Sequence, residues 1–356
     1  MVYNFNAGPG ILPAGVLREA SEGLINFNNM GLSIAEIGHR TPEFEGVLNE
    51  AIATVKELAQ LDGDKEVLFL HGGASTQFMQ VPINLLNEGE TAAYIDNGVW
   101  GVKAIKEAKL FGNVDVVSTT KDRNYTYISK EFTLAPGTTY LHYTTNNTIE
   151  GTEWKTIPDS GTVPLVADMS SDIFSRTTDF NRFSLIYAGA QKNSGAAGVN
   201  LLIIDKKILP LIKRKVPTIL DYRQHISNGS MLNTPPVLAI YISMLTLRWL
   251  KNLGGIAAIE KINGQKAQLF YNTIDALPMF TGIVAREDRS NMNGVFVMND
   301  PALEKLFTDY CDQQNIYGIK GHRSVGGFRA SFYNALPLSS VEVLCQLMID
   351  FASKHG

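Results

Sequence analysis

The feature that most constrains the fold is a regular alternation of short apolar runs with helical patterns between about Leu58 and Ile204. Helical spacing is found over 76–86 and 100–110. Strands that alternate with helices predict a mostly parallel sheet that helices cover on both faces. In such a sheet, ligands bind in the loops that follow the carboxyl ends of the strands. The apolar runs lie at 67–70, 92–95, 114–117, 139–143, 163–167, 183–187 and 199–204.

The character of the chain changes after Gly254 and Gly255. This part predicts a second, smaller α/β domain. Ser339 or Ser340 is a plausible N-cap of its closing helix. The expected elements are a helix over 256–277, a strand over 293–298, a helix over 303–315, a strand over 328–333 and a helix over 339–354. We therefore expect a large domain over 14–255, a small C-terminal domain over 256–356, and an N-terminal segment over 1–13 that packs near the small domain.

Composition and charge exclude several classes of protein. The formal net charge of −4 gives no basic field for nucleic acid or for an anionic membrane. No apolar stretch reaches the roughly 18–20 residues that span a bilayer, and the N-terminus lacks the basic start and apolar core of a signal peptide. Cys311 and Cys345 show neither metal-ligand spacing nor a disulfide framework, so we expect both in the core. These observations predict a cytoplasmic protein without a metal site.

Lys192 and Asp168 carry the clearest chemical signal. Lys192 lies in a loop of small residues between the apolar runs 183–187 and 199–204, and Asp168 follows the run 163–167. Burial lowers the pKa of a lysine and makes its amine a usable nucleophile. Pyridoxal phosphate chemistry needs a lysine that forms a Schiff base and an aspartate that keeps the pyridinium nitrogen protonated. The pair therefore points to that cofactor.

Three further patterns fit an anionic cofactor and an anionic substrate, although each is weak alone. The Gly-rich turn over 71–77 offers backbone N–H groups and hydroxyls to a phosphate, and it lacks the fingerprints of nucleotide loops. Trp100 opens a helix after a strand and could stack on a planar ring, although a packing role is more common. Basic side chains near Gly-rich segments suit carboxylate or phosphate binding, namely His39, Arg40, His322, Arg323 and Arg329.

Together these motifs resemble those of the phosphoserine aminotransferases, a class V family of the fold type I pyridoxal phosphate enzymes. The resemblance extends over essentially the whole chain, through the segments 5–10, 38–40, 71–78, 187–193, 228–236, 320–327 and 329–335. It implies an α/β fold with a large domain, built on a mostly parallel mixed sheet covered by helices, and a smaller C-terminal α/β domain. It also implies pyridoxal 5'-phosphate as cofactor, and a homodimer with the active site at the subunit interface.

The resemblance implies a role for each residue of the site. Lys192 would hold the cofactor in a Schiff base, Asp168 would pair with the pyridine nitrogen, and Trp100 would stack on the ring. Thr148 would hydrogen-bond the phenolic oxygen of the cofactor. The cofactor phosphate would be held by Ala74, Ser75 and Gln191 and, from the partner subunit, by Asn233 and Thr234. The substrate's carboxylate and phosphate would be bound by His39, Arg40, His322, Arg323 and Arg329.

Two residues depart from the family pattern. Some members have an arginine where this chain has Ser75, which would leave more of the phosphate binding to backbone donors. The residue before Thr148 is often acidic in the family, whereas here it is Asn147. The threonine itself is kept, so we retain its expected role.

The implied reaction transfers an amino group from L-glutamate to 3-phosphohydroxypyruvate, giving O-phospho-L-serine and 2-oxoglutarate for L-serine biosynthesis. A second role on phosphohydroxythreonine in pyridoxine synthesis is also implied. The alternatives are another class V enzyme, such as a small-amino-acid:glyoxylate aminotransferase or a desulfurase, a noncatalytic nucleotide-binding module, and a cofactor-free structural protein. Neither Cys311 nor Cys345 is predicted on the mobile loop that a desulfurase needs, and a glyoxylate enzyme would have little use for so many anion-binding side chains.

Overall fold

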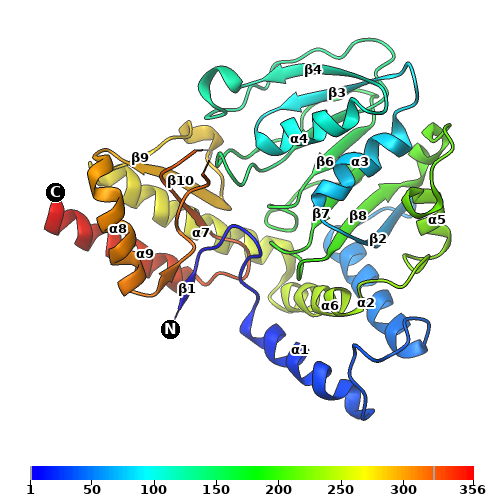
Figure 1. Ribbon diagram of the computed structural model, residues 1–356, viewed down its shortest axis with the longest axis horizontal. Coiled ribbons are helices and arrows are strands. Elements are labelled where there is room, and N and C mark those ends of the chain that lie inside the picture. Colours follow the sequence, from blue (N-terminus) through cyan, green and yellow to red (C-terminus); the bar gives the residue numbers. More distant parts are fainter. Residues whose placement is uncertain (1, 324) are drawn as a thin grey trace.

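The computed structural model describes residues 2–323 and 325–356, and its centre is a seven-stranded mixed sheet with the strand order β2-β8-β7-β6-β5-β3-β4 (Figure 1). The strands from β4 to β7 pair in parallel, and β8 is antiparallel to both of its neighbours. The strands are β2 (Lys65–His71), β3 (Thr91–Asp96), β4 (Asn113–Thr119), β5 (Leu141–Thr144), β6 (Leu165–Asp168), β7 (Leu185–Gly189) and β8 (Val199–Asp205). The mostly parallel mixed sheet expected from the sequence is therefore confirmed.

Helices cover both faces of this sheet because successive strand residues point to opposite sides. Val67 and Phe69 of β2 belong to one buried apolar cluster with helices α2 (Pro42–Leu58) and α6 (Val237–Asn252). Leu68 and Leu70 belong to a second cluster, with helices α3 (Ala74–Leu85) and α4 (Val99–Ala108). Helix α1 (Ala14–Asn26) packs on α6, and the short helix α5 (Tyr222–Ser227) lies near β2.

The C-terminal part of the chain has its own sheet and its own core. Three antiparallel strands in the order β12-β10-β9 pack with aromatic side chains of α7, α8 and α9. The elements are α7 (Gly255–Ala276), β9 (Phe280–Gly282), β10 (Asn293–Met298), α8 (Glu304–Gln313), β11 (Ile316–Tyr317), β12 (Phe328–Ser331) and α9 (Leu338–His355). Strand β1 (Tyr3–Asn4) pairs with β11, so the N-terminal segment lies against this part (Figure 1).

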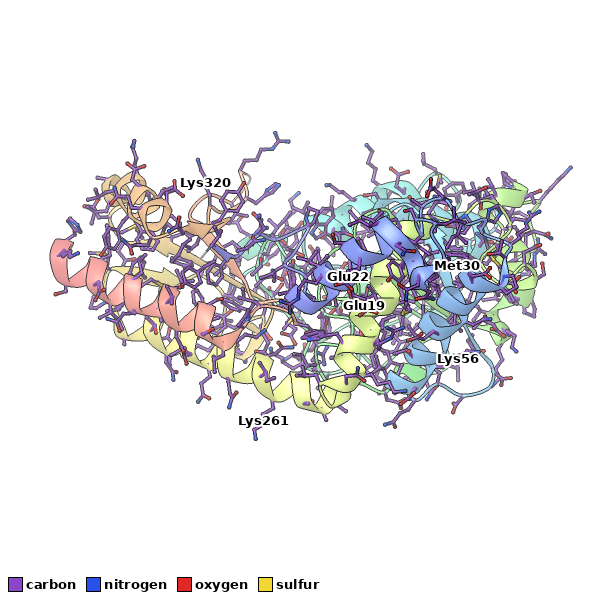
Figure 2. The ribbon with its side chains drawn as sticks, turned by 90° about the horizontal axis from the view of Figure 1, so that it is seen from below. Glu19, Glu22, Met30, Lys56, Lys261 and Lys320 are labelled. Atoms are coloured by element: carbon purple, nitrogen blue, oxygen red, sulfur yellow. The ribbon has the colours of Figure 1, made fainter. Side chains whose placement is uncertain are left out.

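We propose that the domain boundary lies at Gly254 and Gly255, as the sequence suggests. Both glycines have left-handed backbone angles, with φ of 108° and 73°, which side chains disfavour. They join α6, which packs in the large core, to α7, which leads into the small core. Seen from below, α7 runs beneath the small domain, and its Lys261 side chain points away from the protein (Figure 2).

Some local expectations were wrong or incomplete. Strand β8 runs antiparallel, because the chain returns from β7 through the short Lys192 loop and not through a helix. Pro337 occupies the N-cap of α9, and Ser339 and Ser340 lie inside the helix, so neither serine caps it. Sequence analysis placed no helix at α1, α2 or α6. Cys311 and Cys345 are buried free thiols, as expected.

Ser324, part of the Gly-rich motif over 320–327, lies outside the described residues. Across the described ranges, every helix is too short or too polar to cross a bilayer. The same ranges hold no group of three or more His, Cys, Asp or Glu side chains placed to bind a metal ion.

Candidate active site

The predicted residues converge on a cavity of about 560 Å³ at the carboxyl ends of the parallel strands. A volume of this size is typical of small-molecule sites. The cavity is lined by the Gly-rich turn before α3, the start of α4, the loop after β5, the end of β6 and the loop between β7 and β8. The predicted site residues among its lining are Ala74, Ser75, Trp100, Thr148, Asp168, Gln191, Lys192, His322 and Arg329.

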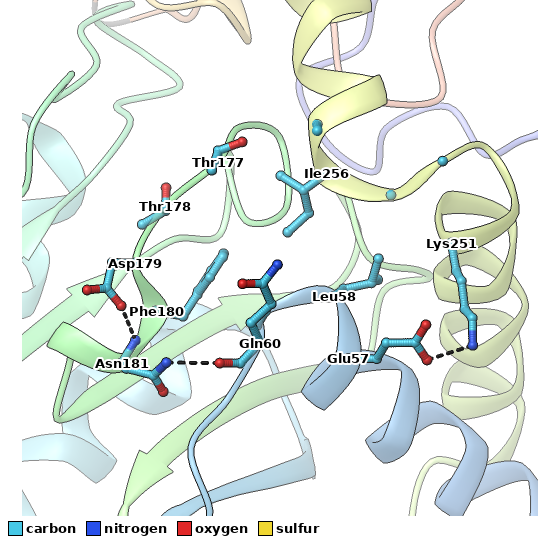
Figure 3. Close-up of a pocket in the computed structure, with 14 residues that line it drawn as sticks. Glu57, Leu58, Gln60, Thr177, Thr178, Asp179, Phe180, Asn181, Lys251 and Ile256 are labelled. Atoms are coloured by element: carbon cyan, nitrogen blue, oxygen red, sulfur yellow. Dashed lines mark hydrogen bonds and ion pairs between the residues drawn. The ribbon is translucent and has the colours of Figure 1, made fainter.

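A second cavity of about 590 Å³ lies between the end of α2, the start of α7 and the segment 177–181 (Figure 3). Lys251 there forms an ion pair of 2.6 Å with Glu57, and the Asn181 side chain donates to the Gln60 carbonyl at 2.9 Å. Of the described residues, those lining this cavity include no predicted site residue. The cavity of about 560 Å³, which is lined by Asp168, Lys192 and Arg329, is therefore the candidate active site.

Lys192 lies in the tight loop that connects β7 to β8, and its side chain is half-buried. Its Nζ donates to Thr148 Oγ1 at 2.7 Å and lies 5.7 Å from the centre of the Trp100 ring. Burial lowers the pKa of the Lys192 amine to about 8, while the nearby Asp168 carboxylate opposes this shift. The amine is therefore much closer to its nucleophilic form at neutral pH than an exposed lysine is.

Asp168 ends β6, and its residue is only 4% exposed. The N–H and the hydroxyl of Ser170 both donate to its Oδ1, at 2.9 and 2.6 Å. No donor among the described residues is assigned to Oδ2. Burial raises the pKa of Asp168, and the two Ser170 hydrogen bonds oppose that rise. A cation beside the free oxygen would stabilise the carboxylate further, so the site is suited to a protonated ring nitrogen.

Trp100 is held at the start of α4 by a buried carboxylate that sequence analysis did not identify. Glu150, 3% exposed, accepts the backbone N–H of Val99 at 2.8 Å through Oε1. This acceptor satisfies one of the free donors at the helix start, where a negative charge is also favourable. Burial raises the pKa of Glu150. The helix start that carries Trp100 is therefore tied to the loop that carries Thr148.

The phosphate-binding end of the cavity is the turn that leads into α3. Gly72 has φ of 101°, a conformation that favours glycine, and Gly73 is the N-cap of α3. The first N–H groups of a helix have no partner within it and favour anions. Ala74 and Ser75 lie in this first turn and line the cavity together with Gln191. The turn can therefore bind a phosphate without an arginine at position 75.

Arg329 and His322 line the small-domain side of the cavity, and Arg329 provides positive charge there. Arg329 lies on β12, and its Nη1 donates to the Thr148 carbonyl at 3.1 Å. Its Nε is buried without a hydrogen-bond partner among the described residues. Burial lowers the pKa of Arg329, and burial together with the neighbouring arginines lowers the pKa of His322. A guanidinium with an unused donor is suited to bind an anion.

Five predicted residues do not line this cavity within one chain. His39 and Arg40 lie in the loop before α2, and Arg323 is exposed. Thr234 is exposed, and its carbonyl is 2.6 Å from His71 Nε2. Asn233 borders a different, smaller cavity.

The N-terminal segment is part of the site, although sequence analysis assigned it no role. Ala7, Gly8 and Pro9 line the cavity, and the Gly10 N–H donates to the Gln191 carbonyl at 2.7 Å. A Cβ on Gly10 would lie 2.6 Å from the Tyr333 ring, so only glycine fits there without movement. The available signal was the motif over 5–10, which formed part of the family resemblance.

The cavity fits pyridoxal phosphate by the chemistry of its donors. It combines an amine of lowered pKa, a buried carboxylate with an unused oxygen, an aromatic face and a phosphate-binding helix start. Thr144 Oγ1, which also lines it, is buried without a partner in the described part of the chain. A buried polar atom of this kind is costly unless a ligand or water satisfies it.

Comparison with known proteins supports the same assignment. Residues 2–344 match the family model for class V aminotransferases. The phosphoserine aminotransferase of Parabacteroides distasonis is 52% identical over 355 residues, which cover 99% of both chains. The solved phosphoserine aminotransferase of Bacillus circulans subsp. alkalophilus is 43% identical, with a TM-score of 0.98 over 100% of this chain and 99% of that one.

A solved phosphoserine aminotransferase from Trichomonas vaginalis, described as bound to PLP, is 35% identical, with a TM-score of 0.93 over 98% of this chain and 100% of that one. These matches confirm the resemblance and the fold type inferred from the sequence. They exclude the structural protein and the noncatalytic nucleotide-binding module. The chain therefore belongs to the phosphoserine aminotransferase family of class V aminotransferases.

Proposed function

We propose that this chain catalyses amino transfer between L-glutamate and 3-phosphohydroxypyruvate, giving O-phospho-L-serine and 2-oxoglutarate, with pyridoxal phosphate as cofactor. The observation that carries the proposal is the convergence of Lys192, Asp168 and Arg329 on one cavity, in a chain of this family. The proposal includes the role in L-serine biosynthesis. It extends to phosphohydroxythreonine in pyridoxine synthesis, since that substrate has the same two kinds of anionic group.

The residues that would hold the cofactor line the cavity from several separate loops and helix starts. Lys192 would provide the covalent attachment, Asp168 would face the ring nitrogen, and Trp100 would cover the ring. The helix start at Ala74 and Ser75 would bind the phosphate, and Gln191 and Thr148 would complete the polar contacts. When bound, pyridoxal phosphate supplies an aldehyde that condenses with amines and a ring that accepts an electron pair from the substrate.

Proton transfer is the task of Lys192. Once released by the incoming amino acid, its Nζ would take the proton from the substrate's α-carbon and later return one. The pKa of about 8 suits this role, because a base works best with a pKa near the operating pH. Thr148 Oγ1, at 2.7 Å, accepts a hydrogen bond from the amine and fixes its direction. General base catalysis of this type typically contributes about 10²–10⁴-fold to the rate.

Substrate anions would be bound by Arg329 and His322, and Arg323, which directly follows His322 in the chain, would complete the set. Guanidinium groups bind carboxylate and phosphate with similar geometry. One set of side chains can therefore accept glutamate, which has two carboxylates, and phosphoserine, which has a carboxylate and a phosphate. This supports the proposed pair of substrates over glyoxylate, which has one small anionic group.

The direct test is the choice of amino donor. With 2-oxoglutarate as acceptor, the purified enzyme loaded with pyridoxal phosphate should form glutamate from O-phospho-L-serine. We expect kcat/KM for alanine and for cysteine to be at least about 10³-fold lower, because neither has a second anion for the arginines and lost charge-assisted contacts of this kind cost several kcal/mol. Glutamate formation, followed by a coupled assay, provides the measurement.

A matched comparison uses L-serine, which differs from the substrate only by the phosphate. A kcat/KM for serine or alanine equal to that for phosphoserine would contradict the proposed substrate. Efficient transfer from alanine to glyoxylate would instead support the alternative aminotransferase. Phosphohydroxythreonine, tested in the same assay, decides whether the pyridoxine role also holds.

The proposed active unit is a homodimer in which each chain completes the site of its partner. Asn233 and Thr234 would reach the cofactor phosphate across the interface, and His39 and Arg40 would reach the substrate in the same way. This explains why none of the four lines the cavity of a single chain. Large apolar side chains on α1 and the loop after it support an interface, since Leu17, Leu24, Ile25, Met30 and Leu32 are between 41% and 78% exposed. Figure 2 shows Met30 at this face.

Mixed dimers test this arrangement. We expect Lys192→Ala to be inactive and the double variant Asn233→Ala/Thr234→Ala to bind the cofactor weakly. Unfolding and refolding the two variants together should restore activity, because one of the two sites in each hybrid dimer then contains no substitution. A random mixture should recover about a quarter of the wild-type activity at limiting cofactor, since half of the dimers are hybrids with one intact site.

The control mixes Lys192→Ala with Asp168→Asn. Both residues belong to the same chain's cavity, so every site in every dimer contains a defect and no recovery is expected. Failure of the first mixture to recover activity, with dimers confirmed by light scattering, would show that Asn233 and Thr234 do not act across the interface.

A further inference from the structure

Two asparagines from the recognised motifs, Asn193 and Asn334, have no role in the site described above. Asn193 directly follows Lys192, and Asn334 lies five positions after Arg329. Both are at least 95% buried. Buried amides are costly unless they are hydrogen-bonded, so their partners indicate what each of them holds in place.

Asn334 is bonded to the large domain at two points. Its backbone N–H donates to Asn193 Oδ1 at 3.0 Å, and its side-chain Nδ2 donates to the Phe174 carbonyl at 3.1 Å. Asn193 in turn donates to the Ser171 carbonyl at 3.3 Å, in the loop that follows Asp168. The segment after β12 is therefore hydrogen-bonded to the loops that carry Lys192 and Asp168.

Helix α7 holds the same segment from the small-domain side. Asn263 Nδ2 donates to Asn334 Oδ1 at 2.8 Å and to the Ser175 carbonyl at 2.9 Å. One turn later, the fully buried Lys266 donates to the carbonyls of Phe332, Tyr333 and Leu336 at 2.6, 3.0 and 3.1 Å. Lys261, on the same helix, points to solvent (Figure 2).

The network is built from directional hydrogen bonds and lies where the two domains meet. Asn334 uses its backbone N–H, its side-chain donor and its side-chain acceptor on three separate elements. Buried directional hydrogen bonds of this kind specify one geometry more strictly than apolar contacts do. Because β12 ends only three residues before Asn334, that geometry includes the placement of Arg329 relative to Lys192.

We propose that Asn334 is a positioning residue that fixes the distance and direction between the substrate-binding Arg329 and Lys192. The inference rests on the proposed function of Arg329 as an anion ligand. We call the hydrogen bonds of Asn334 to Asn193, Phe174 and Asn263 the clamp. In the wild type, the clamp holds Arg329 in the position that binds the substrate anion, before the substrate arrives. Loss of the clamp leaves the cofactor site in place, because the cofactor contacts lie on the large domain, and it weakens the binding of anions.

The test compares Asn334→Ala with Asn299→Ala, a control that removes hydrogen bonds of an exposed asparagine in the same domain. For Asn334→Ala we expect the KM for phosphoserine to rise about 10-fold, since displacement of a binding group by 1 Å can cost on the order of 10²-fold. Cofactor occupancy, measured by absorbance, should be unchanged, and kcat per loaded site should change much less than KM. Asn263→Ala removes the bonds from α7 to the Asn334 side chain and to the Ser175 carbonyl, but it leaves the bonds from Asn334 to Asn193 and Phe174. It should therefore change KM in the same direction by a smaller factor.

A purely structural role would lower the folded fraction, and therefore the apparent kcat, without raising KM, and that result would overturn the proposal. Binding of inorganic phosphate to the loaded enzyme, measured by calorimetry, tests the clamp without turnover. We expect about 10-fold weaker binding in Asn334→Ala, and no further effect of that substitution in an Arg329→Ala background. Equal phosphate affinity in wild type and Asn334→Ala would also overturn the clamp. Failure of wild-type enzyme to use phosphoserine would count against the proposed function alone.

Discussion

Replacement of Lys192 by alanine should reduce turnover of phosphoserine by at least about 10⁴-fold, because one substitution removes both the covalent attachment point and the general base. Among the described residues that line the cavity, the other basic side chains are Arg329 and His322, and neither carries a primary amine that could form a Schiff base. Borohydride treatment followed by peptide mass spectrometry gives a readout independent of turnover. The Lys192 peptide of the wild type should gain the mass of the reduced cofactor.

The control for this substitution is Lys106→Ala, an exposed lysine on α4. It should retain both the adduct on Lys192 and wild-type turnover. Adding a small primary amine should restore part of the activity of Lys192→Ala, because a free amine can enter the cavity and act as base. Near-normal turnover of Lys192→Ala without any added amine would contradict the assignment.

The lowered pKa of Lys192 gives a pH dependence that can be measured on protein without cofactor. Burial disfavours the ammonium, so the amine loses its proton at a lower pH than an exposed lysine does. The rate of modification by an amine-specific reagent should therefore rise with a midpoint of about pH 8. Exposed lysines, with a pKa of about 10.4, should still be mostly protonated at that pH.

Much of this site could be predicted from the sequence, because its reactive side chains lie at or just after the ends of strands. Apolar runs predicted the strands that end at Asp168 and lead into the Lys192 loop, and parallel pairing brings such ends together. The antiparallel direction of β8 was not predicted, although the short connection after β7 carries that signal, because parallel neighbours need a crossover of about a dozen residues or more. Helices α2 and α6 were not predicted from the sequence. Their role is to cover one face of the large sheet, and that role becomes visible only in the folded structure.

Residues that act through long-range hydrogen bonds were the hardest to predict. Glu150 caps a helix that begins 51 positions earlier, and the Asn334 N–H meets Asn193 across 141 positions. Nothing in the local sequence distinguishes such a buried carboxylate or amide from one in a surface turn. His39 and Arg40 illustrate a different limit, because a residue proposed to act across a subunit interface cannot be placed from one chain.

Asp168→Asn should lower kcat on the order of 10²–10³-fold while leaving attachment of the cofactor to Lys192 intact. The amide has almost the same shape as the carboxylate, but it cannot balance a positive charge on the ring nitrogen. Without that charge the ring accepts the substrate's electron pair poorly. Ser170, which donates twice to Oδ1, should still hold the amide oxygen, so the fold should be preserved. Both kcat and the reduced Lys192 adduct are measured on the same preparation.

The pH profile distinguishes this role from a structural one. Burial raises the pKa of Asp168, and pairing with a protonated ring nitrogen would lower it again. Protonation of the carboxylate at acidic pH should therefore weaken cofactor affinity in the wild type, whereas Asp168→Asn should lack this pH dependence. Asp64→Asn, at an exposed aspartate, serves as control and should behave as wild type. An Asp168→Asn enzyme with wild-type kcat would show that the ring nitrogen needs no anionic partner here.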